Sequence, residues 1–255
     1  MKEDRTVLTR GAPPPDETLS YGTERDQIAE VRLPRKSVPR PLLLLVHGGY
    51  WRPAIDRLHL SSAAFALCGL GYTVALIEYR RIPGAPEHML ADVSAALEQL
   101  PGRIASHDGR VILIGHSAGG HLALWAGALR PASALAGVLA LAPLADLHLA
   151  DTLCLGGGAV REFLGSKAIG PFDPRLMPAP PVATTIIHGD ADAIVPAALS
   201  ESYVGTHPRT RWVKLHEVGH FALIDPDNAA WDRVTEEVAR LATARESGSA
   251  SAPGP

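Results

Sequence analysis

The segment VILIGHSAGGHLALWAGAL, residues 111–129, joins an apolar run to an apolar stretch of helical spacing through the short turn GHSAG. A chain that reverses within so few residues needs small side chains two positions before and two positions after the serine. Gly115 and Gly119 occupy these positions. Such a turn leaves the serine hydroxyl exposed at the edge of a sheet, as in the GxSxG elbow that carries a nucleophile. We therefore expect a strand, a sharp turn and a helix here, with Ser117 as the candidate nucleophile.

Other short apolar runs alternate with longer segments of helical periodicity along the chain. Several runs are apolar at every position, which indicates strands that are buried on both faces. This pattern is typical of an α/β protein with a mostly parallel twisted sheet and helices on both faces. We expect strands over residues 28–33, 42–46, 73–77, 111–114, 137–141, 182–187 and 212–215, and helices over residues 57–68, 87–100, 118–129, 196–204 and 228–244.

The chain length of 255 residues allows one large domain, which we place at residues 21–245. Residues 1–20 and 246–255 are rich in Pro, Gly, Ser or charged residues, so we expect a flexible N-terminal segment and a disordered tail. Residues 143–180 lack a regular pattern but retain apolar side chains. We interpret them as a short lid insertion in the domain.

The composition argues against several classes of protein. A formal net charge of -3 with scattered arginines offers no basic surface for nucleic acid, and no segment is apolar and long enough for a membrane span. Cys68 and Cys154 lack the spacing of metal ligands, so we expect buried free thiols in a cytoplasmic protein. We expect a small-molecule substrate, no cofactor and no metal, and the sequence leaves a homodimer open.

A second glycine-containing loop follows an apolar run in PLLLLVHGGYW, residues 41–51. Attack of a serine on a carbonyl builds negative charge on oxygen, which a backbone N–H group can stabilise by roughly 2.7–4 kcal/mol. Glycines let the backbone approach the substrate closely. We expect the amides of Gly49, Tyr50 and Ala118 to form this oxyanion hole. His47 is expected to brace the loop through hydrogen bonds.

Two later loops, HGDADAIVP and EVGHFALIDP, offer the carboxylate and the imidazole that a serine nucleophile needs. The order serine, aspartate, histidine is the one in which a strand–turn–helix serine site assembles its triad. We choose Asp192 as the acid because it lies further out on its loop than Asp190, which is expected to cap a turn. We choose His220 as the base over His216, because Gly219 frees the backbone that precedes it.

His116 and His121 flank the serine but are excluded as the base. The neighbour of a nucleophile cannot bring its imidazole in line with the hydroxyl. His121 begins the face of the expected helix, where a packed or hydrogen-bonded structural histidine is the simpler interpretation.

Together these motifs resemble the α/β-hydrolase superfamily over residues 21–244. HGGYW resembles the HGGxW motif of kynurenine formamidases and is similar to the HGGG loop of hormone-sensitive-lipase-like esterases, with Tyr50 at the third glycine. EYRRIPGAPEH, residues 78–88, is similar to the YRLAPEH segment of the latter family. The resemblance implies the α/β-hydrolase fold and places the acid on Asp192 and the histidine on His220.

The motifs and the resemblance predict a serine hydrolase that needs no cofactor. The expected reaction is hydrolysis of a small carboxylic ester, or of an activated amide such as an aryl formamide, through an acyl-serine intermediate. Two alternatives stay open: a small-peptide peptidase of the prolyl-oligopeptidase type, and a non-catalytic ligand-binding member of the fold. We expect the substrate pocket to be lined by Tyr50, Trp51, Leu153, Leu155, Phe163 and Leu164.

Overall fold

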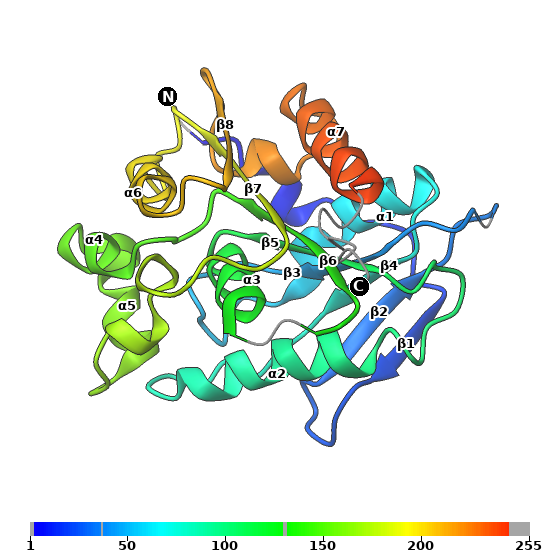
Figure 1. The fold of residues 1–255 in the computed structure, drawn as a ribbon, viewed down its shortest axis with the longest axis horizontal. Coiled ribbons are helices and arrows are strands. Elements are labelled where there is room, and N and C mark those ends of the chain that lie inside the picture. Colours follow the sequence, from blue (N-terminus) through cyan, green and yellow to red (C-terminus); the bar gives the residue numbers. More distant parts are fainter. Residues whose placement is uncertain (1–2, 37, 130–131, 245–255) are drawn as a thin grey trace, which may run out of the picture.

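The computed structural model describes residues 3–36, 38–129 and 132–244, and Figure 1 shows its fold. Its sheet has eight strands in the order β1-β2-β4-β3-β5-β6-β7-β8. The strands β4, β3, β5, β6, β7 and β8 are parallel to one another. At one edge β1 pairs antiparallel with β2, and β2 pairs antiparallel with β4. The strands are β1 (Glu17–Ser20), β2 (Ile28–Arg32), β3 (Leu42–Val46), β4 (Val74–Ile77), β5 (Val111–His116), β6 (Leu135–Leu141), β7 (Ala183–Gly189) and β8 (Arg211–Leu215).

Each strand expected from the sequence is present, and the mostly parallel sheet is confirmed. Strand β1 is not among the expected strands, and its residues are largely exposed at the edge of the sheet. An edge strand of this kind carries little apolar periodicity, so a pattern of buried residues cannot indicate it.

Helices cover both faces of the sheet, with α1 and α7 on one face and α2 and α3 on the other (Figure 1). The single helix expected over residues 57–68 is divided into a 3-10 turn, η2 (Arg57–Leu60), and α1. The helices are α1 (Ser61–Gly69), α2 (Pro86–Gln99), α3 (Ala118–Leu129), α4 (Leu147–Thr152), α5 (Ala159–Leu164), α6 (Ala198–Thr206) and α7 (Ala230–Thr243).

Strand β3 explains why the sheet needs a layer of helices on each side. All of its residues are buried. Leu42 and Leu44 belong to the apolar cluster shared with α2 and α3, while Leu43 and Leu45 belong to the cluster shared with α1 and α7. Alternate side chains of a strand point to opposite faces, so an unbroken apolar run is buried only if both faces are covered.

The insertion at residues 143–180 is more regular than the sequence indicated. It contains α4, α5 and three short 3-10 turns, η3 (Leu155–Gly157), η4 (Gly170–Phe172) and η5 (Pro174–Leu176). Val160 and Phe163 of α5 are buried in the cluster that includes α2 and α3. Helices this short have too few periodic positions for recognition in a sequence.

The N-terminal segment, which the sequence predicts to be flexible over residues 1–20, packs against the domain in the part that the structure describes. Thr6–Thr9 form a 3-10 turn, η1, in which Val7 is 1% exposed and packs in the cluster of α1 and α7. Arg10 forms an ion pair with Asp225. Composition cannot reveal this packing, because a single buried valine and a few ion pairs anchor an otherwise polar segment.

The expected tail, residues 246–255, lies outside the described residues. Cys68 and Cys154 are free thiols, but Cys68 is half-buried and Cys154 is exposed, so the prediction that both are buried is wrong. Among the helices of the described residues, none combines the length and the apolar character that crossing a bilayer requires.

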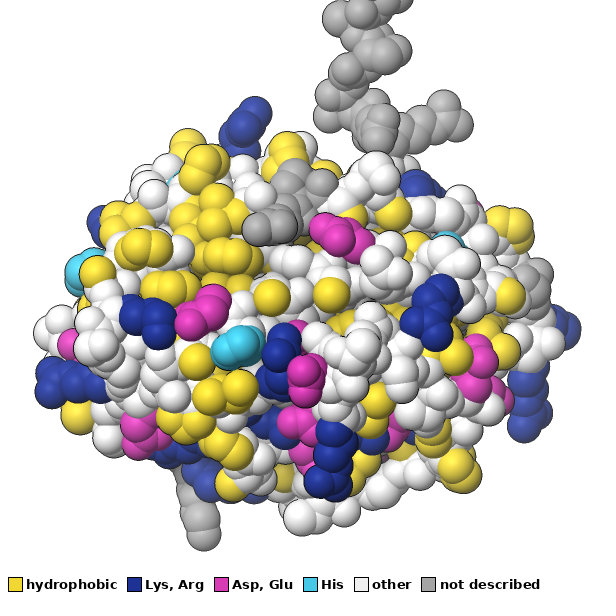
Figure 2. Space-filling view, turned by 90° about the horizontal axis from the view of Figure 1, so that it is seen from below, with side chains coloured by type: hydrophobic (Ala, Val, Ile, Leu, Met, Phe, Trp, Pro, Cys, Tyr) yellow, Lys and Arg dark blue, Asp and Glu magenta, His cyan; other side chains and the backbone are white. Residues whose placement is uncertain are grey.

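Figure 2 shows the face of the molecule that lies at the bottom of Figure 1. Lysine and arginine side chains are interspersed with aspartate and glutamate on this face, and neither sign gathers into a broad patch. This mixture agrees with the formal net charge of -3 and the scattered arginines of the sequence.

The variant Val7→Ala tests the packing of the N-terminal segment. It should lower the free energy of unfolding by about 1–2 kcal/mol, because it removes buried methyl groups and leaves a cavity. Val38→Ala is the matched control, since Val38 is 52% exposed, and it should change this free energy by less than about 0.5 kcal/mol. Urea unfolding followed by circular dichroism measures both, and equal stability of the two variants would contradict the described packing.

Candidate active site

Ser117 lies at the turn between β5 and α3 with a φ of 57°, in the left-handed region that residues with a Cβ rarely adopt. A Cβ on Gly115 would lie 2.1 Å from the carbonyl oxygen of Gly119, and a Cβ on Gly119 would lie 2.2 Å from that of Val46. Both glycines are therefore required by close contact between backbones. The Ser117 amide donates to the Leu141 carbonyl at 2.8 Å, which attaches the turn to β6.

The structure brings His220 and Asp192 together from the loops that follow β8 and β7. The Nδ1 of His220 lies 2.6 Å from Oδ2 of Asp192. The amides of Ile194 and Val195 each donate to Oδ1 at 2.8 Å. Because its own loop holds one oxygen, the carboxylate has a fixed orientation and presents the other oxygen to the imidazole.

His188 is a second histidine on this carboxylate, and the sequence analysis did not single it out. Its Nε2 lies 3.1 Å from Oδ2 of Asp192, and its Nδ1 lies 2.7 Å from the hydroxyl of Ser200. Burial alone would raise the pKa of Asp192, but the hydrogen bonds from His188 and His220 outweigh it and hold the pKa below its usual range. Asp192 therefore stays ionised near neutral pH and can orient the base without taking its proton.

Ser117 and His220 line the same cavity, which has a volume of about 460 Å³. Because Asp192 occupies Nδ1 of His220, the Nε2 atom is the nitrogen available to the serine. Among the described residues, no hydrogen bond joins Ser117 to His220. Such bonds are often long in an active site without substrate and shorten when the substrate binds.

The glycine loop after β3 packs directly on the serine turn. A Cβ on Gly48 would lie 2.9 Å from the Cβ of Ser117. Gly49 and Tyr50 have φ values of 110° and 52°, so the loop turns sharply beside the serine. Within the part of the chain that the structure describes, the amides of Gly49, Tyr50 and Ala118 donate to no acceptor. Gly49 and Tyr50 line the cavity of Ser117, and Ala118 follows Ser117 directly, so these three N–H groups are the candidate donors to an oxygen bound beside the serine.

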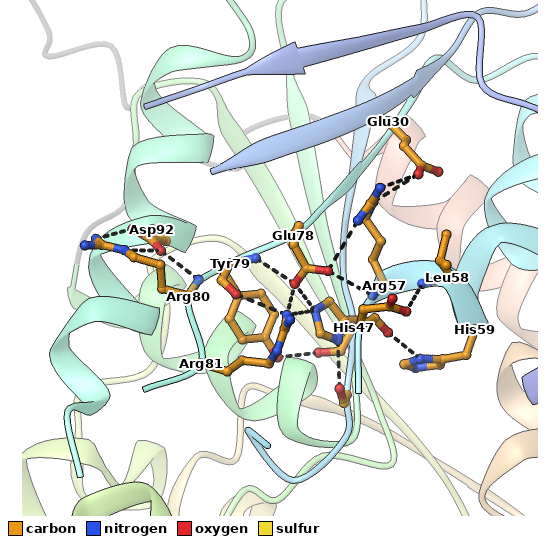
Figure 3. A network of polar contacts seen from close by, with 12 residues as sticks. Glu30, His47, Arg57, Leu58, His59, Glu78, Tyr79, Arg80, Arg81 and Asp92 are labelled. Carbon is orange, nitrogen blue, oxygen red and sulfur yellow. Dashed lines mark hydrogen bonds and ion pairs between the residues drawn. The ribbon is translucent and has the colours of Figure 1, made fainter. Parts of the chain in front are cut away.

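A buried polar network supports the glycine loop from behind, and Figure 3 shows it. The carboxylate of Glu78 lies 2.9 Å from Nε2 of His47, accepts from the Tyr79 amide at 3.0 Å and contacts the Arg81 guanidinium. It also accepts from the Arg57 amide at 3.2 Å. The Tyr79 hydroxyl donates to the His47 carbonyl at 2.9 Å, and the two rings stack with centroids 4.4 Å apart. The EYRR segment thus forms the support of this loop.

His47 sets the orientation of one peptide in the loop. Burial and the nearby Arg81 guanidinium lower the pKa of His47 to about 3, so the ring is neutral and has a single N–H. The Gly48 carbonyl lies 2.8 Å from Nδ1 and the Glu78 carboxylate lies 2.9 Å from Nε2, and both oxygens can only accept, so the single N–H donates to one of them. The Arg81 guanidinium lies 3.1 Å from Nε2 and also contacts Glu78. Since C=O and N–H point in opposite directions in a trans peptide, the Gly49 N–H points away from His47.

Apolar side chains line part of the cavity beside Ser117, together with the polar side chains of Arg5, Asp56 and His59. Arg52 also lines it, but its guanidinium is committed to Glu162 at 2.8 Å. No group of three or more His, Cys, Asp or Glu side chains in the described ranges is arranged to hold a metal ion. The apolar lining consists of Leu8, Ala54, Ile55, Leu58, Ile194 and Phe221, with the Tyr50 ring beside them.

The predicted pocket residues other than Tyr50 do not line the cavity of Ser117. Trp51 and Phe163 are buried and stack on each other with ring centroids 4.4 Å apart. The insertion packs behind the glycine loop, and none of its described residues lines the cavity of Ser117. Leu153 is exposed on the insertion, whereas Leu155 and Leu164 pack against the core.

The remaining candidate residues have structural partners. His116 has Nε2 3.2 Å from the His220 carbonyl, and its ring packs on that of His220. His121 has Nε2 2.8 Å from a main-chain carbonyl in the insertion. His216 is exposed and pairs with Asp190 at 3.0 Å. Neither His216 nor Asp190 reaches the cavity of Ser117.

The N-terminal segment reaches the site, and the sequence analysis missed its residues. Arg5 and Leu8 line the cavity, and a carboxylate oxygen of Glu3 accepts from the His220 amide at 2.9 Å. No local pattern marks these residues, because their neighbours in the sequence have the composition of a linker.

The chain is similar to one protein family, to a curated relative and to several solved structures. Residues 30–141 match the model of the BD-FAE family. The uncharacterized protein Rv2307c from Mycobacterium tuberculosis (strain H37Rv) is 31% identical to this chain over 190 residues, which cover 71% of this chain and 63% of that relative. The chain thus matches less than two thirds of the length of this curated relative.

Three solved structures illustrate the likeness. A "putative thioesterase" from Silicibacter sp. TM1040 is 27% identical with a TM-score of 0.69, covering 86% of each chain. A carbohydrate esterase from gut microbiota is 18% identical with a TM-score of 0.77, covering 91% of this chain and 100% of its own. Esterase B from Lactobacillus rhamnosis, inhibited by a tributyrin phosphonate, is 17% identical with a TM-score of 0.74, covering 90% of this chain and 86% of its own. The protein described here has the α/β-hydrolase fold.

Proposed function

We propose that this protein is a serine hydrolase that cleaves small carboxylic esters through an acyl-serine intermediate. The observation that carries the proposal is the 2.6 Å contact between His220 and Asp192 beside the cavity that Ser117 lines. The esterase neighbours of the same fold support hydrolysis of an ester. In this proposal Ser117 is the nucleophile, His220 the general base and Asp192 the orienting acid.

The reaction follows from the positions of these groups. Ser117 Oγ forms a bond to the carbonyl carbon while its proton passes to Nε2 of His220, and the carbonyl π electrons move to oxygen. The amides of Gly49 and Ala118 donate to this oxyanion. When the C=O bond reforms, the alkoxide leaves with the proton of His220. Water then attacks the acyl-serine in the same way and releases the acid.

The cavity favours an uncharged, largely apolar substrate of modest size. Its volume of about 460 Å³ lies within the usual range for small-molecule sites, and Ile55, Leu58 and Phe221 contribute apolar surface. A short-chain ester of an aromatic or aliphatic alcohol suits such a lining. An aryl formamide presents the same carbonyl chemistry and a flat apolar group, so it is the activated amide to compare with esters.

Replacement of the nucleophile tests the proposal most directly. Ser117→Ala should lower kcat on p-nitrophenyl acetate and butyrate by about 10⁴–10⁶-fold and abolish labelling by a fluorophosphonate. Ser94→Ala is the control, because Ser94 is also buried but donates only to the Leu90 carbonyl in α2. Wild-type turnover in Ser117→Ala would rule the proposal out, and parallel assays on N-formylkynurenine decide between ester and formamide preference.

Asp192→Asn tests the orienting acid. Asparagine has a single oxygen, which cannot accept both from the amides of Ile194 and Val195 and from His220, so the imidazole loses its tautomer and its orientation. We expect kcat to fall by about 10⁴-fold with little change in KM. Asp190→Asn is the matched control, since Asp190 pairs with the exposed His216 instead. Equal losses in the two variants would show that Asp192 has no special role.

Gly49→Ala tests the oxyanion loop. At a φ of 110° an alanine is strained, and its Cβ would lie 2.4 Å from the Ile55 side chain. The Gly49 amide should therefore move, so kcat should fall by about 10²–10³-fold, and the strain should lower the melting temperature by roughly 2–8 °C. Gly11→Ala, where no atom lies within 4 Å of the new Cβ, is the control. An unchanged kcat in a folded Gly49→Ala protein would remove Gly49 from the oxyanion hole.

A further inference from the structure

The carboxylate of Glu3 joins the two loops that carry His220 and Asp192. Its Oε1 accepts from the amide of Ala193 at 2.9 Å, and its Oε2 accepts from the amide of His220 at 2.9 Å. Ala193 follows Asp192 directly in the sequence. One side chain from the N-terminal segment therefore accepts hydrogen bonds from the backbone of the Asp192 loop and of the His220 loop. The carboxylate and the imidazole that these loops carry are 2.6 Å apart.

Gly219 provides the space for this carboxylate. A Cβ on Gly219 would lie 2.5 Å from Oε2 of Glu3. The sequence analysis interpreted this glycine as a source of backbone freedom before His220. In the structure its φ is not in the left-handed region, and the lack of a side chain matters because Glu3 packs there.

The segment that carries Glu3 is anchored on both sides of the histidine loop. Val7 is buried in the cluster formed with α1 and α7. Arg10 pairs with Asp225, which follows His220 by one short turn, η6 (Phe221–Ile224). The histidine loop is thus held by Glu3 at the start of this turn and by Arg10 at its end.

We propose that Glu3 is a positioning residue of the active site, whose carboxylate fixes the His220 loop against the Asp192 loop. This inference rests on the proposed function. A backbone amide that donates to an ionised carboxylate makes a stronger hydrogen bond than one that donates to water, so the contact restricts both loops. Small displacements of a base from its nucleophile reduce the rate steeply, which makes the restriction matter for catalysis.

The segment also closes one side of the cavity. Arg5 and Leu8 lie on opposite sides of the buried Val7 in the chain, and both line the space beside Ser117. Movement of Glu3 away from the two loops would therefore displace this wall of the cavity as well as His220. A purely structural role for Glu3 would lower stability and leave turnover unchanged.

The experiment compares Glu3→Ala and Glu3→Gln with the control Asp4→Asn. Asp4 is also acidic, but it accepts only from the Thr6 amide at 2.9 Å, a bond that asparagine can keep. Steady-state kinetics on p-nitrophenyl butyrate, the rate of fluorophosphonate labelling and the exchange of the Ala193 and His220 amides with deuterium are measured on the full chain. Thermal unfolding identifies variants that fail to fold.

We expect Glu3→Ala to lower kcat by about 10–100-fold, with a smaller change in KM, and to speed exchange of both amides. Glu3→Gln should lose less, because its amide oxygen can still accept from one of the two N–H groups. Asp4→Asn should match the wild type in all three measurements.

Two results would overturn the proposal. One is unchanged kcat and labelling in a folded Glu3→Ala protein, whatever its stability. The other is unchanged protection of the Ala193 and His220 amides, which would show that the contact does not restrain the loops. A wild type that neither hydrolyses esters nor reacts with the fluorophosphonate refutes the proposed function instead, and amide exchange then still decides whether Glu3 holds the two loops.

Discussion

The chain reverses at Ser117 so tightly that three backbone segments touch without side chains between them. Gly119 in α3 lies against the Val46 carbonyl at the end of β3, and Gly48 in the following loop lies against Ser117 itself. A methyl group at either glycine would overlap atoms of the neighbouring segment. The glycine loop after β3 and the turn at Ser117 are therefore positioned by the same close contacts.

This contact needs support from behind, since a loop with consecutive positive φ values is not stable by itself. The support is ionic. An unpaired Glu78 carboxylate buried at this place would cost several kcal/mol, but Arg57, Arg81 and the Tyr79 amide all contact it. The neighbouring Arg80 is held in the same manner by Asp92. The network is therefore a means of fixing geometry, and it connects the glycine loop to strand β4 and helix α2.

The sequence predicted the parts of this arrangement that lie within single segments. The apolar runs predicted the strands, and the turn GHSAG predicted the position of Ser117, because in both cases the physical cause is local. The choice of Asp192 and His220 also used local evidence, namely their places in the loops after two strands. The structure adds the hydrogen bonds that distinguish Asp192 from Asp190, which bonds His216 at the surface.

What the sequence could not predict depends on contacts between distant segments. Glu3 looks like part of a polar linker until the loops of Ala193 and His220 are placed beside it. Trp51 and Phe163 look like pocket residues, and only their stacking shows that they form core. In both cases the residue type is compatible with either role, and the partner that decides is more than a hundred positions away.

Three consecutive residues of the glycine loop contact two different parts of the fold. The Tyr50 hydroxyl donates to the Ile194 carbonyl in the acid loop at 2.9 Å, Trp51 stacks on α5, and Arg52 pairs with Glu162 in the same helix. The insertion therefore acts on the loop from behind through α5, while the acid loop restrains it through Tyr50. Asp192 lies two residues before Ile194, so the glycine loop is bonded to the loop of Asp192 on one side and packed on the insertion on the other. No described residue of the insertion lines the cavity of Ser117, so in the structure the insertion supports the glycine loop and does not cover the cavity.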